Sequence, residues 1–212
     1  MSVDQTPVRG RLDKRQAILD AAFRVFAEHG YERASIDAIA AAAGVAKPTI
    51  YNHLGGKENL FRAVMVNSAE QFNARTLAAL DAFPADPGDP DALRAALVDV
   101  GVRLGGCIAD DRALAMQRLL LAESRRFPDL FAAVRGSGRD RVHDALAGRL
   151  ARLAHAGRLD IADPVCAADQ FVALISGDLP VLAMMSGTSV RAQDLRRSVE
   201  SGVDTFLRAF AA

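Results

Sequence analysis

The sequence predicts an all-α protein, and three of its features favour that class. Alanine, the residue with the highest helix propensity, accounts for 41 of the 212 residues. Apolar residues recur at spacings of three and four, as they do in amphipathic helices. Runs of β-branched residues are few, and no stretch alternates between apolar and polar residues as a half-buried strand does.

The first 80 residues predict four helices separated by glycines. An apolar stripe marks the first helix, over residues 13–29, and Gly30 after it is a candidate left-handed cap. Ser35 is a good N-cap for the second helix, and Gly44 ends that helix. A pair of glycines at 55–56 breaks the chain again before a long helix. The predicted ranges of the second, third and fourth helices are 36–43, 47–54 and 57–80.

The remaining residues predict five more helices after a proline-rich loop. The loop spans 81–91 and holds three prolines and one glycine. Pro128 and Pro164 stand where helices are expected to begin. Pro180 lies inside a predicted helix, where it removes a backbone hydrogen bond, so we expect a kink near Asp178. The predicted ranges of these helices are about 91–106, 111–124, 128–156, 164–186 and 190–210.

Composition excludes several classes of protein. Half of the residues are apolar and 25% are charged, which is too apolar for a disordered chain and too charged for a membrane bundle. No stretch approaches the roughly 18–20 apolar residues of a spanning helix, and residues 1–14 lack the apolar core of a secretory signal. Cys107 and Cys166 form neither a disulfide framework nor a metal-binding pattern. We therefore expect no metal, no membrane association and a reducing, cytoplasmic compartment.

The charge is balanced over the whole chain but not along it. Residues 1–62 hold nine basic and seven acidic residues, a net of +2, whereas residues 63–212 hold 17 and 19, a net of −2. This excess is too small to prove a nucleic-acid partner, but it indicates which end of the chain would meet one. Arg9, Arg11, Lys14 and Arg15 form a basic arm at that end, which either reaches a groove or a phosphate or is disordered.

Residues 36–54 have the pattern of a helix-turn-helix. Two short helices cross closely only where a small residue faces the crossing, and Ala40 fills that position; Gly44 supplies the positive φ of the turn. Ile50 and Leu54 point inward, so the outward residues of the second helix are one cation and four hydrogen-bonding groups. Such a face suits the DNA major groove. The alternative is an alanine-rich helical hairpin with a solvated polar face. The outward residues are Lys47, Thr49, Tyr51, Asn52 and His53.

Residues 15–65 resemble the N-terminal DNA-binding domain of the TetR family of bacterial transcriptional regulators. The resemblance rests on residues in family spacing, among them Ala22, Phe26, Gly30, Tyr31, Ile39, Ala40, Gly44, Val45, Tyr51, His53, Lys57, Glu58 and Leu60. It implies a DNA-binding domain over residues 12–60, with the helix-turn-helix at about 35–54, and a ligand-binding and dimerisation domain over 61–212. It further implies a homodimer that binds a near-palindromic double-stranded DNA operator and is released by a small molecule.

Two positions depart from the family pattern. Ala46 stands where the family often has serine or threonine ahead of the recognition helix, and losing such a cap costs about 1 kcal/mol. Pro48, with its fixed helical φ in the first turn, partly offsets that loss. The second departure is at 54–55, where Leu54 and Gly55 replace an aromatic and a polar residue.

Eight residues are candidates for DNA binding. The resemblance implies that Lys57 contacts a phosphate and that Tyr51 and His53 meet the DNA backbone. Lysine donates to guanine and the threonine methyl contacts thymine, so Lys47 and Thr49 are the candidate base readers. A solvated lysine at 57 and half-buried packing residues at 51 and 53 are the alternatives. The full candidate set is Ser35, Lys47, Pro48, Thr49, Tyr51, Asn52, His53 and Lys57.

The C-terminal half carries the predicted dimer and ligand surfaces. In 190–210 an apolar stripe runs from Leu195 to Phe210, and a stripe of that width is usually plain core. The resemblance implies that the last two long helices pair with their copies in a second chain. Residues 122–131 look like the AefR-like subset of TetR C-terminal domains. We expect an apolar or amphipathic effector, because no cluster of charges or histidines marks a polar one. The candidate ligand residues, each of which is alternatively ordinary core, are Cys107, Met116, Leu120, Phe127, Phe131, Phe171 and Met184.

The sequence gives no support to catalysis. It has no HExxH, no GxSxG and no phosphate- or dinucleotide-binding glycine motif, and its four histidines are scattered. We therefore expect no cofactor and a transcriptional regulator, by family default a repressor released by its effector. The alternative is a DNA-binding adaptor that acts through a protein partner without a small-molecule inducer. An enclosed apolar cavity favours the regulator, and a filled C-terminal core favours the adaptor.

Overall fold

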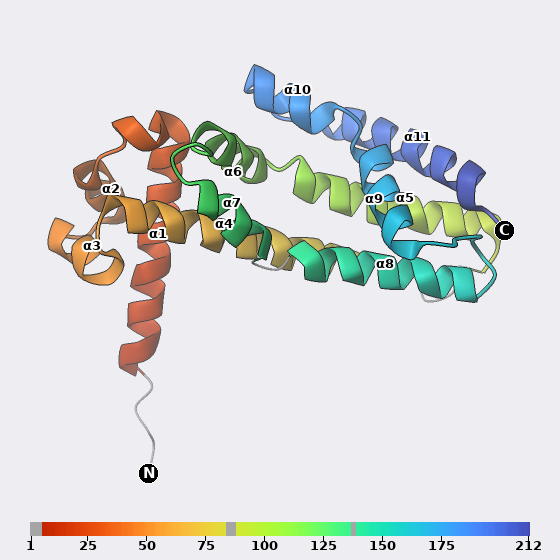
Figure 1. Cartoon of the computed structure of the whole chain (residues 1–212), viewed down its shortest axis with the longest axis horizontal. Coiled ribbons are helices and arrows are strands. Elements are labelled where there is room, and N and C mark those ends of the chain that lie inside the picture. The colour runs from red at the N-terminus through yellow and green to blue at the C-terminus, as the bar shows by residue number, and fades with distance from the viewer. Residues whose placement is uncertain (1–5, 84–87, 137–138) are drawn as a thin grey trace, which may run out of the picture. The chain divides into compact units, whose positions relative to one another are not determined.

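A computed structural model describes the backbone of residues 6–83, 88–136 and 139–212, and the side chains of these residues outside 1–13 and 135–139. Within these ranges the chain forms eleven helices and no strand, so the all-α prediction is confirmed (Figure 1). The helices are α1 Thr6–Arg33, α2 Ile36–Ala43, α3 Lys47–Leu54, α4 Lys57–Leu80, α5 Pro90–Ile108, α6 Asp111–Ala122, α7 Pro128–Gly136, α8 Arg139–His155, α9 Pro164–Ser176, α10 Leu179–Ser186 and α11 Ala192–Phe210.

The helices divide between two compact units. The first unit takes in residues up to Ala69 together with Met116–Val134, and the second takes in Glu70–Ala115 together with Arg135–Ala212. Helix α4 carries residues of both units. The first unit thus contains, besides the predicted DNA-binding residues 12–60, the end of α6, the α6–α7 connection and most of α7.

Local signals set the ends of α2, α3 and α4. Ser35 accepts a hydrogen bond from the backbone N–H of Ala38 at 3.1 Å, as its predicted role as N-cap of α2 requires. Gly44 has φ 65° and ends α2 in the left-handed conformation. Gly55, with φ 72°, ends α3 in the same way. All three helices have the bounds that the sequence predicted.

The second unit has a core of apolar side chains from α4, α5, α8, α9 and α11. Phe171 of α9 and Phe206 of α11 are fully buried there, with ring centroids 5.1 Å apart. Glycine permits the closest approach. A Cβ at Gly202 of α11 would lie 2.4 Å from the carbonyl oxygen of Leu174 on α9, so no larger residue fits without a backbone shift. Figure 1 shows α9 lying across α5 and α11 in this unit.

Three predicted helices have different bounds in the structure. Helix α1 begins at Thr6 rather than at residue 13, because Pro7 is tolerated in a first turn. Gly30 has the expected positive φ of 73° but a ψ of 170°, and the helical path resumes after it. The predicted helix 128–156 is two helices, α7 and α8. Residues 137–138, between these two helices, lie outside the described part of the chain. Residues 84–87 of the predicted loop also lie outside the described part of the chain.

The kink predicted near Asp178 is a break between two helices. Gly177, with φ 54°, ends α9, and Pro180 lies in the first turn of α10, where it has no hydrogen bond to remove. The axes of α9 and α10 differ by 51°. No single helix within the described ranges is long and apolar enough to span a membrane; only this bent pair meets the criteria of length and composition.

Candidate nucleic-acid interface

Helices α2 and α3 pack through the apolar residues that the sequence predicted to face inward. The turn between them is closed by the N–H of Val45, which donates to the carbonyl oxygen of Ala40 at 3.0 Å. Ile39 and Ile50 are fully buried, and Leu54 is buried as well. Leucine therefore keeps the packing role at position 54 although the family commonly has an aromatic residue there. This contact fixes which face of α3 meets solvent.

The polar residues of α3 lie on its solvent side. Lys47, Asn52 and His53 are exposed, and Tyr51 is 49% exposed. Pro48 is also exposed, whereas Thr49 is half-buried. The structure thus presents the predicted set on one short helix. A major groove accepts a helix of this kind, and hydrogen-bonding side chains read base edges there.

Helix α3 begins without a side-chain cap. Ala46 has the extended backbone of an N-cap residue, with φ −74° and ψ 142°, but it offers no hydrogen bond to the first turn. Pro48 lies in that first turn, where its missing N–H leaves no partner unsatisfied. The departure from the family pattern that the sequence indicated at position 46 is therefore present in the structure as an uncapped recognition helix.

One acidic residue lies against this polar face and was not predicted. Asp37, in the first turn of α2, accepts a hydrogen bond from Lys47 Nζ at 3.0 Å, and the same nitrogen lies 3.0 Å from its other carboxylate oxygen. The hydrogen bond raises the pKa of the Lys47 ammonium. The candidate base reader is thus partnered within its own helix-turn-helix.

Lys57 lies at the first residue of α4, above an aromatic cluster. Its ammonium donates to the backbone carbonyl of Glu32 at 2.9 Å and sits 4.7 Å from the centroid of the Tyr31 ring. Tyr31 stacks on Phe26 and meets Phe61 edge to face, at centroid distances of 6.0 and 5.0 Å. The backbone N–H groups of a helix N-terminus favour anions, so a lysine there suits contact with a phosphate.

The α6–α7 connection completes this cluster. Phe127 is buried with its ring centroid 5.1 Å from that of Tyr31 and 5.3 Å from that of Phe61. Arg126 forms an ion pair with the Glu32 carboxylate, and its guanidinium lies 4.5 Å from the Tyr31 centroid. Burial is the largest cause of a raised pKa for the Tyr31 phenol. The connection is therefore joined to the end of α1 by both an aromatic and an ionic contact.

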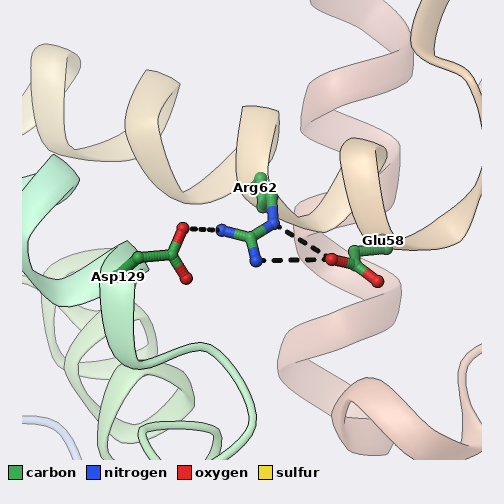
Figure 2. Close-up of polar contacts among 3 residues, drawn as sticks. All are labelled: Glu58, Arg62 and Asp129. Atoms are coloured by element: carbon green, nitrogen blue, oxygen red, sulfur yellow. Dashed lines mark hydrogen bonds and ion pairs between the residues drawn. The ribbon is translucent and has the colours of Figure 1, made fainter.

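A second arginine–carboxylate pair joins α7 to α4. Figure 2 shows Arg62 between two acidic residues, with Asp129 of α7 on one side and Glu58 of its own helix on the other. Arg62 Nη1 lies 2.6 Å from Asp129 Oδ2, and this hydrogen bond lowers the pKa of the Asp129 carboxyl. Sequence reasoning missed both pairs, because no local pattern signals a contact between segments so far apart in the chain.

The predicted ligand residues are divided between the two units. Met116, Leu120, Phe127 and Phe131 belong to the first unit, and Cys107, Phe171 and Met184 belong to the second. Phe127 and Phe171 are buried in aromatic clusters, whereas Phe131 is 51% exposed. Cys107 is half-buried, which raises the pKa of its thiol. Their role in ligand binding stays a prediction.

The second unit has a pocket of about 390 Å³ where α10 meets α11. It is partly open, and none of the seven predicted ligand residues is among those that line it. Its lining includes Leu182, Ser186, Val190 and Arg191. Among the side chains that the structure describes, no group of three or more His, Cys, Asp or Glu is placed to hold a metal ion.

Two family descriptions match the chain. "Bacterial regulatory proteins, tetR family" matches residues 18–64, which contain α2, α3 and Lys57. "AefR-like transcriptional repressor, C-terminal domain" matches residues 95–212, more than half of the chain. Together the two matches include the helix-turn-helix, the α6–α7 connection and every helix that follows.

Individual relatives agree with these descriptions. The transcriptional repressor AcnR of Corynebacterium glutamicum is 48% identical over 52 residues, which are 24% of this chain and only 28% of that relative. A solved TetR-family structure from Mesorhizobium loti is 27% identical, with a TM-score of 0.85 over 95% of this chain and 98% of the other. The flavonoid-responsive regulator FrrA is 31% identical, with a TM-score of 0.67 over 94% of this chain and 97% of its own.

Proposed function

The chain belongs to the TetR family of bacterial transcriptional regulators, and from that premise we propose that it is a repressor released from its operator by a small molecule. The observation that carries the proposal is the exposed face of α3, where hydrogen-bonding side chains stand outward because Ile50 and Leu54 are buried. The repressors to which the chain is similar support the sign of the regulation.

Within this proposal the DNA contacts fall into two kinds. Lys47 and Thr49 read base edges in the major groove, with Asn52 beside them. Ser35, Tyr51, His53 and Lys57 contact the DNA backbone, and Pro48 orders the first turn of α3. Phosphate contacts set the register but carry no sequence information, so the two kinds are separable by experiment.

We propose a homodimer that places two recognition helices about 34–36 Å apart, one turn of DNA, or a little more. Val199, Val203 and Phe206 of the α11 stripe are buried within the second unit, so we assign this stripe to its core. Helix α10 instead exposes three large apolar side chains at helical spacing, which are Val181, Leu182 and Met185. A second copy that covers this face would remove it from water.

The effector we propose is amphipathic rather than purely apolar. Two buried polar atoms of α4, Asn67 Nδ2 and Ser68 Oγ, have no hydrogen-bond partner in the described part of the chain. A buried polar group left unpaired costs about 1–3 kcal/mol, which a ligand oxygen would recover. The similarity to a regulator that responds to flavonoids, which join aromatic rings to hydroxyl groups, supports the same class.

Release from DNA requires coupling between effector and operator. An effector lowers operator affinity only if it binds the DNA-incompetent state more tightly, and a 100-fold release needs about 2.8 kcal/mol of differential affinity. Helix α4 is the proposed carrier, because it begins at Lys57 and carries residues of both units.

The adaptor without an inducer remains the second candidate. The observation that favours it is the packed core of the second unit, in which Phe171 is fully buried and against which Cys107 packs. The full-length similarity to an effector-responsive regulator favours the repressor more strongly.

The experiment begins with selection of duplexes from a random pool by the purified protein. A selected near-palindrome supports the proposal, and no preference for any duplex at low ionic strength contradicts it. Lys57→Ala should weaken binding to all DNA sequences alike and reduce the dependence of the affinity on salt, whereas Lys47→Ala should change the sequence preference. Amphipathic compounds are then screened for release of the selected duplex. Release favours the repressor, and failure of the whole screen favours the adaptor.

A further inference from the structure

The ring of Tyr31 carries two cations. Lys57 Nζ lies 4.7 Å from its centroid and the Arg126 guanidinium lies 4.5 Å from it. Tyr31 is 5% exposed and its ring is packed by Phe26, Phe61 and Phe127. Two positive charges beside one ring repel each other, and an acidic residue nearby reduces that repulsion.

Glu32, the next residue along the chain, serves both cations in different ways. Its backbone carbonyl accepts a hydrogen bond from Lys57, and its carboxylate forms the ion pair with Arg126. Lys57 is therefore held by the neutral backbone oxygen of Glu32, while the negative charge of the Glu32 carboxylate is neutralised by Arg126. The Glu32 side chain is 70% exposed, so it has room to turn if Arg126 leaves it.

The competition for Lys57 follows from simple electrostatics. An ammonium gains more from a carboxylate than from a neutral carbonyl, and hydrogen bonds between ionised groups are roughly twice as strong as neutral ones. A free Glu32 carboxylate beside Lys57 would thus compete with a DNA phosphate for the same ammonium. Arg126 removes that competitor by pairing with it.

We propose that Arg126 is a positioning residue for DNA binding, which occupies the Glu32 carboxylate and so leaves Lys57 available to a phosphate. The inference rests on the proposed function, in which Lys57 contacts the DNA backbone. Arg126 lies in the α6–α7 connection, within the residues that match the AefR-like C-terminal domain. An effector that displaces this connection would set Glu32 free and weaken the phosphate contact without moving α3.

The alternative is that Arg126 acts only as a mechanical clip. The structure offers a matched control for that role, because Asp129 and Arg62 make a neighbouring ion pair that joins α7 to α4 without touching Glu32 or Lys57. Asp129→Asn removes the charge from a docking contact of the same kind and leaves the charge on Glu32 paired.

The test uses the full-length protein and the duplex recovered by selection, with affinity measured by fluorescence anisotropy over a range of salt. Arg126→Ala should weaken binding about tenfold and reduce the salt slope by about one. Arg126→Lys should retain most of the affinity, because it keeps the positive charge. Glu32→Gln should bind no more weakly than the wild type, and Arg126→Ala combined with Glu32→Gln should recover wild-type affinity. Asp129→Asn should leave the affinity unchanged. Circular dichroism establishes that each variant is folded.

Three results would overturn the inference. If Glu32→Gln weakens binding as Arg126→Ala does, the pair acts as a clip. If the double variant binds as weakly as Arg126→Ala, Arg126 contacts DNA itself. If Asp129→Asn matches Arg126→Ala, docking alone matters. Lys57→Ala distinguishes failure of this inference from failure of the proposed function. In all three cases above, Lys57→Ala still weakens binding to DNA. If Lys57→Ala binds DNA with wild-type affinity, Lys57 does not contact a phosphate as proposed, and the inference fails with that proposal.

Discussion

Lys47 Nζ lies 3.0 Å from both carboxylate oxygens of Asp37, so the candidate base reader of α3 is paired with the first turn of α2. Both side chains are exposed, at 47% for Lys47 and 72% for Asp37. An exposed pair contributes little to stability, because water and salt screen it. If Lys47 reads a base edge as proposed, it must exchange the carboxylate for that edge on binding DNA.

We predict that Asp37→Asn strengthens binding to duplex DNA severalfold at low salt. The substitution removes a negative charge beside the proposed DNA-binding face and frees Lys47 from its partner. The protein itself should become slightly less stable, because an acidic residue in a first turn favours the helix dipole by about 0.3–1 kcal/mol. Anisotropy titrations measure the affinity, and thermal unfolding measures the stability.

The control for this prediction is a double-mutant cycle with Lys47→Ala. If Asp37 acts by restraining Lys47, Asp37→Asn should have little effect in the Lys47→Ala background. An equal gain in both backgrounds would mean that Asp37 repels the phosphates directly, and the interpretation of the pair would be wrong.

The N-termini of the two helices of the helix-turn-helix give a matched pair of capping predictions. Ser35→Ala removes the bond to the Ala38 N–H and should lower the free energy of unfolding by about 1 kcal/mol. Ala46→Ser adds a hydroxyl at a residue whose backbone is already extended, so it should raise that free energy by a similar amount. Urea unfolding followed by circular dichroism measures both. A loss of stability in Ala46→Ser would show that position 46 cannot act as a cap.

How much of the molecule could be predicted depended on the range of the interactions concerned. The ends of α2, α3 and α4 were predicted because Ser35, Gly44 and the glycines after α3 act on adjacent residues. The inward side of α3 was predicted from Ile50 and Leu54 for the same reason. A helix boundary that depends on neighbouring residues can be predicted from the local sequence.

Contacts between distant segments could not be predicted. Nothing near Glu32 in the sequence indicates Arg126, and nothing near Lys47 distinguishes Asp37 from any other exposed acid. The sequence left open whether the stripe of α11 is core or part of a surface between copies; Val199 and Phe206 are buried by α5 and α9 of their own chain. Periodicity shows that a face is covered but does not identify the element that covers it.

Gly202 gives a prediction about the core of the second unit. Gly202→Ala places a methyl group 2.4 Å from the Leu174 carbonyl oxygen, so α9 and α11 must separate, at a cost of about 1–3 kcal/mol in the free energy of unfolding. Gly106→Ala in α5 is the control, because its added Cβ meets no atom within 4 Å. It should stabilise the protein by about 0.5–1 kcal/mol. Equal effects in urea unfolding would contradict the close approach of α9 and α11.

The pair formed by Arg94 of α5 and Asp204 of α11 predicts a pH dependence. Arg94 Nε and Nη2 donate to the two carboxylate oxygens at 2.6 and 3.1 Å, which lowers the pKa of Asp204. A carboxyl whose pKa is lower in the folded chain stabilises the fold above its unfolded pKa, about 3.9, and the contribution is lost as the pH falls through the folded value.

Asp204→Asn should therefore be less stable than the wild type at pH 7, and the difference should shrink as the pH falls below about 3.9 and vanish below the lowered pKa of folded Asp204. Urea unfolding at several pH values measures the difference. A gap that stays constant down to pH 3 would mean that the substitution acts through packing rather than through the charge of Asp204.

The exposed face of α10 gives the last prediction, which concerns assembly. Leu182 and Met185 are 52% and 81% exposed in the protomer and lie three residues apart, on one side of the helix. If a second copy covers them, Leu182→Asp should place an unpaired charge in an apolar interface and shift the dimer to a monomer. Light scattering at micromolar concentration measures the change. Leu121→Asp is the control, because Leu121 is an equally apolar side chain, 66% exposed on α6, outside the proposed interface. It should remain dimeric. Operator affinity of the Leu182→Asp protein should fall with the loss of the second recognition helix. A Leu182→Asp variant that stays dimeric would mean that the copies contact each other elsewhere. A wild-type monomer would mean that there is no such contact.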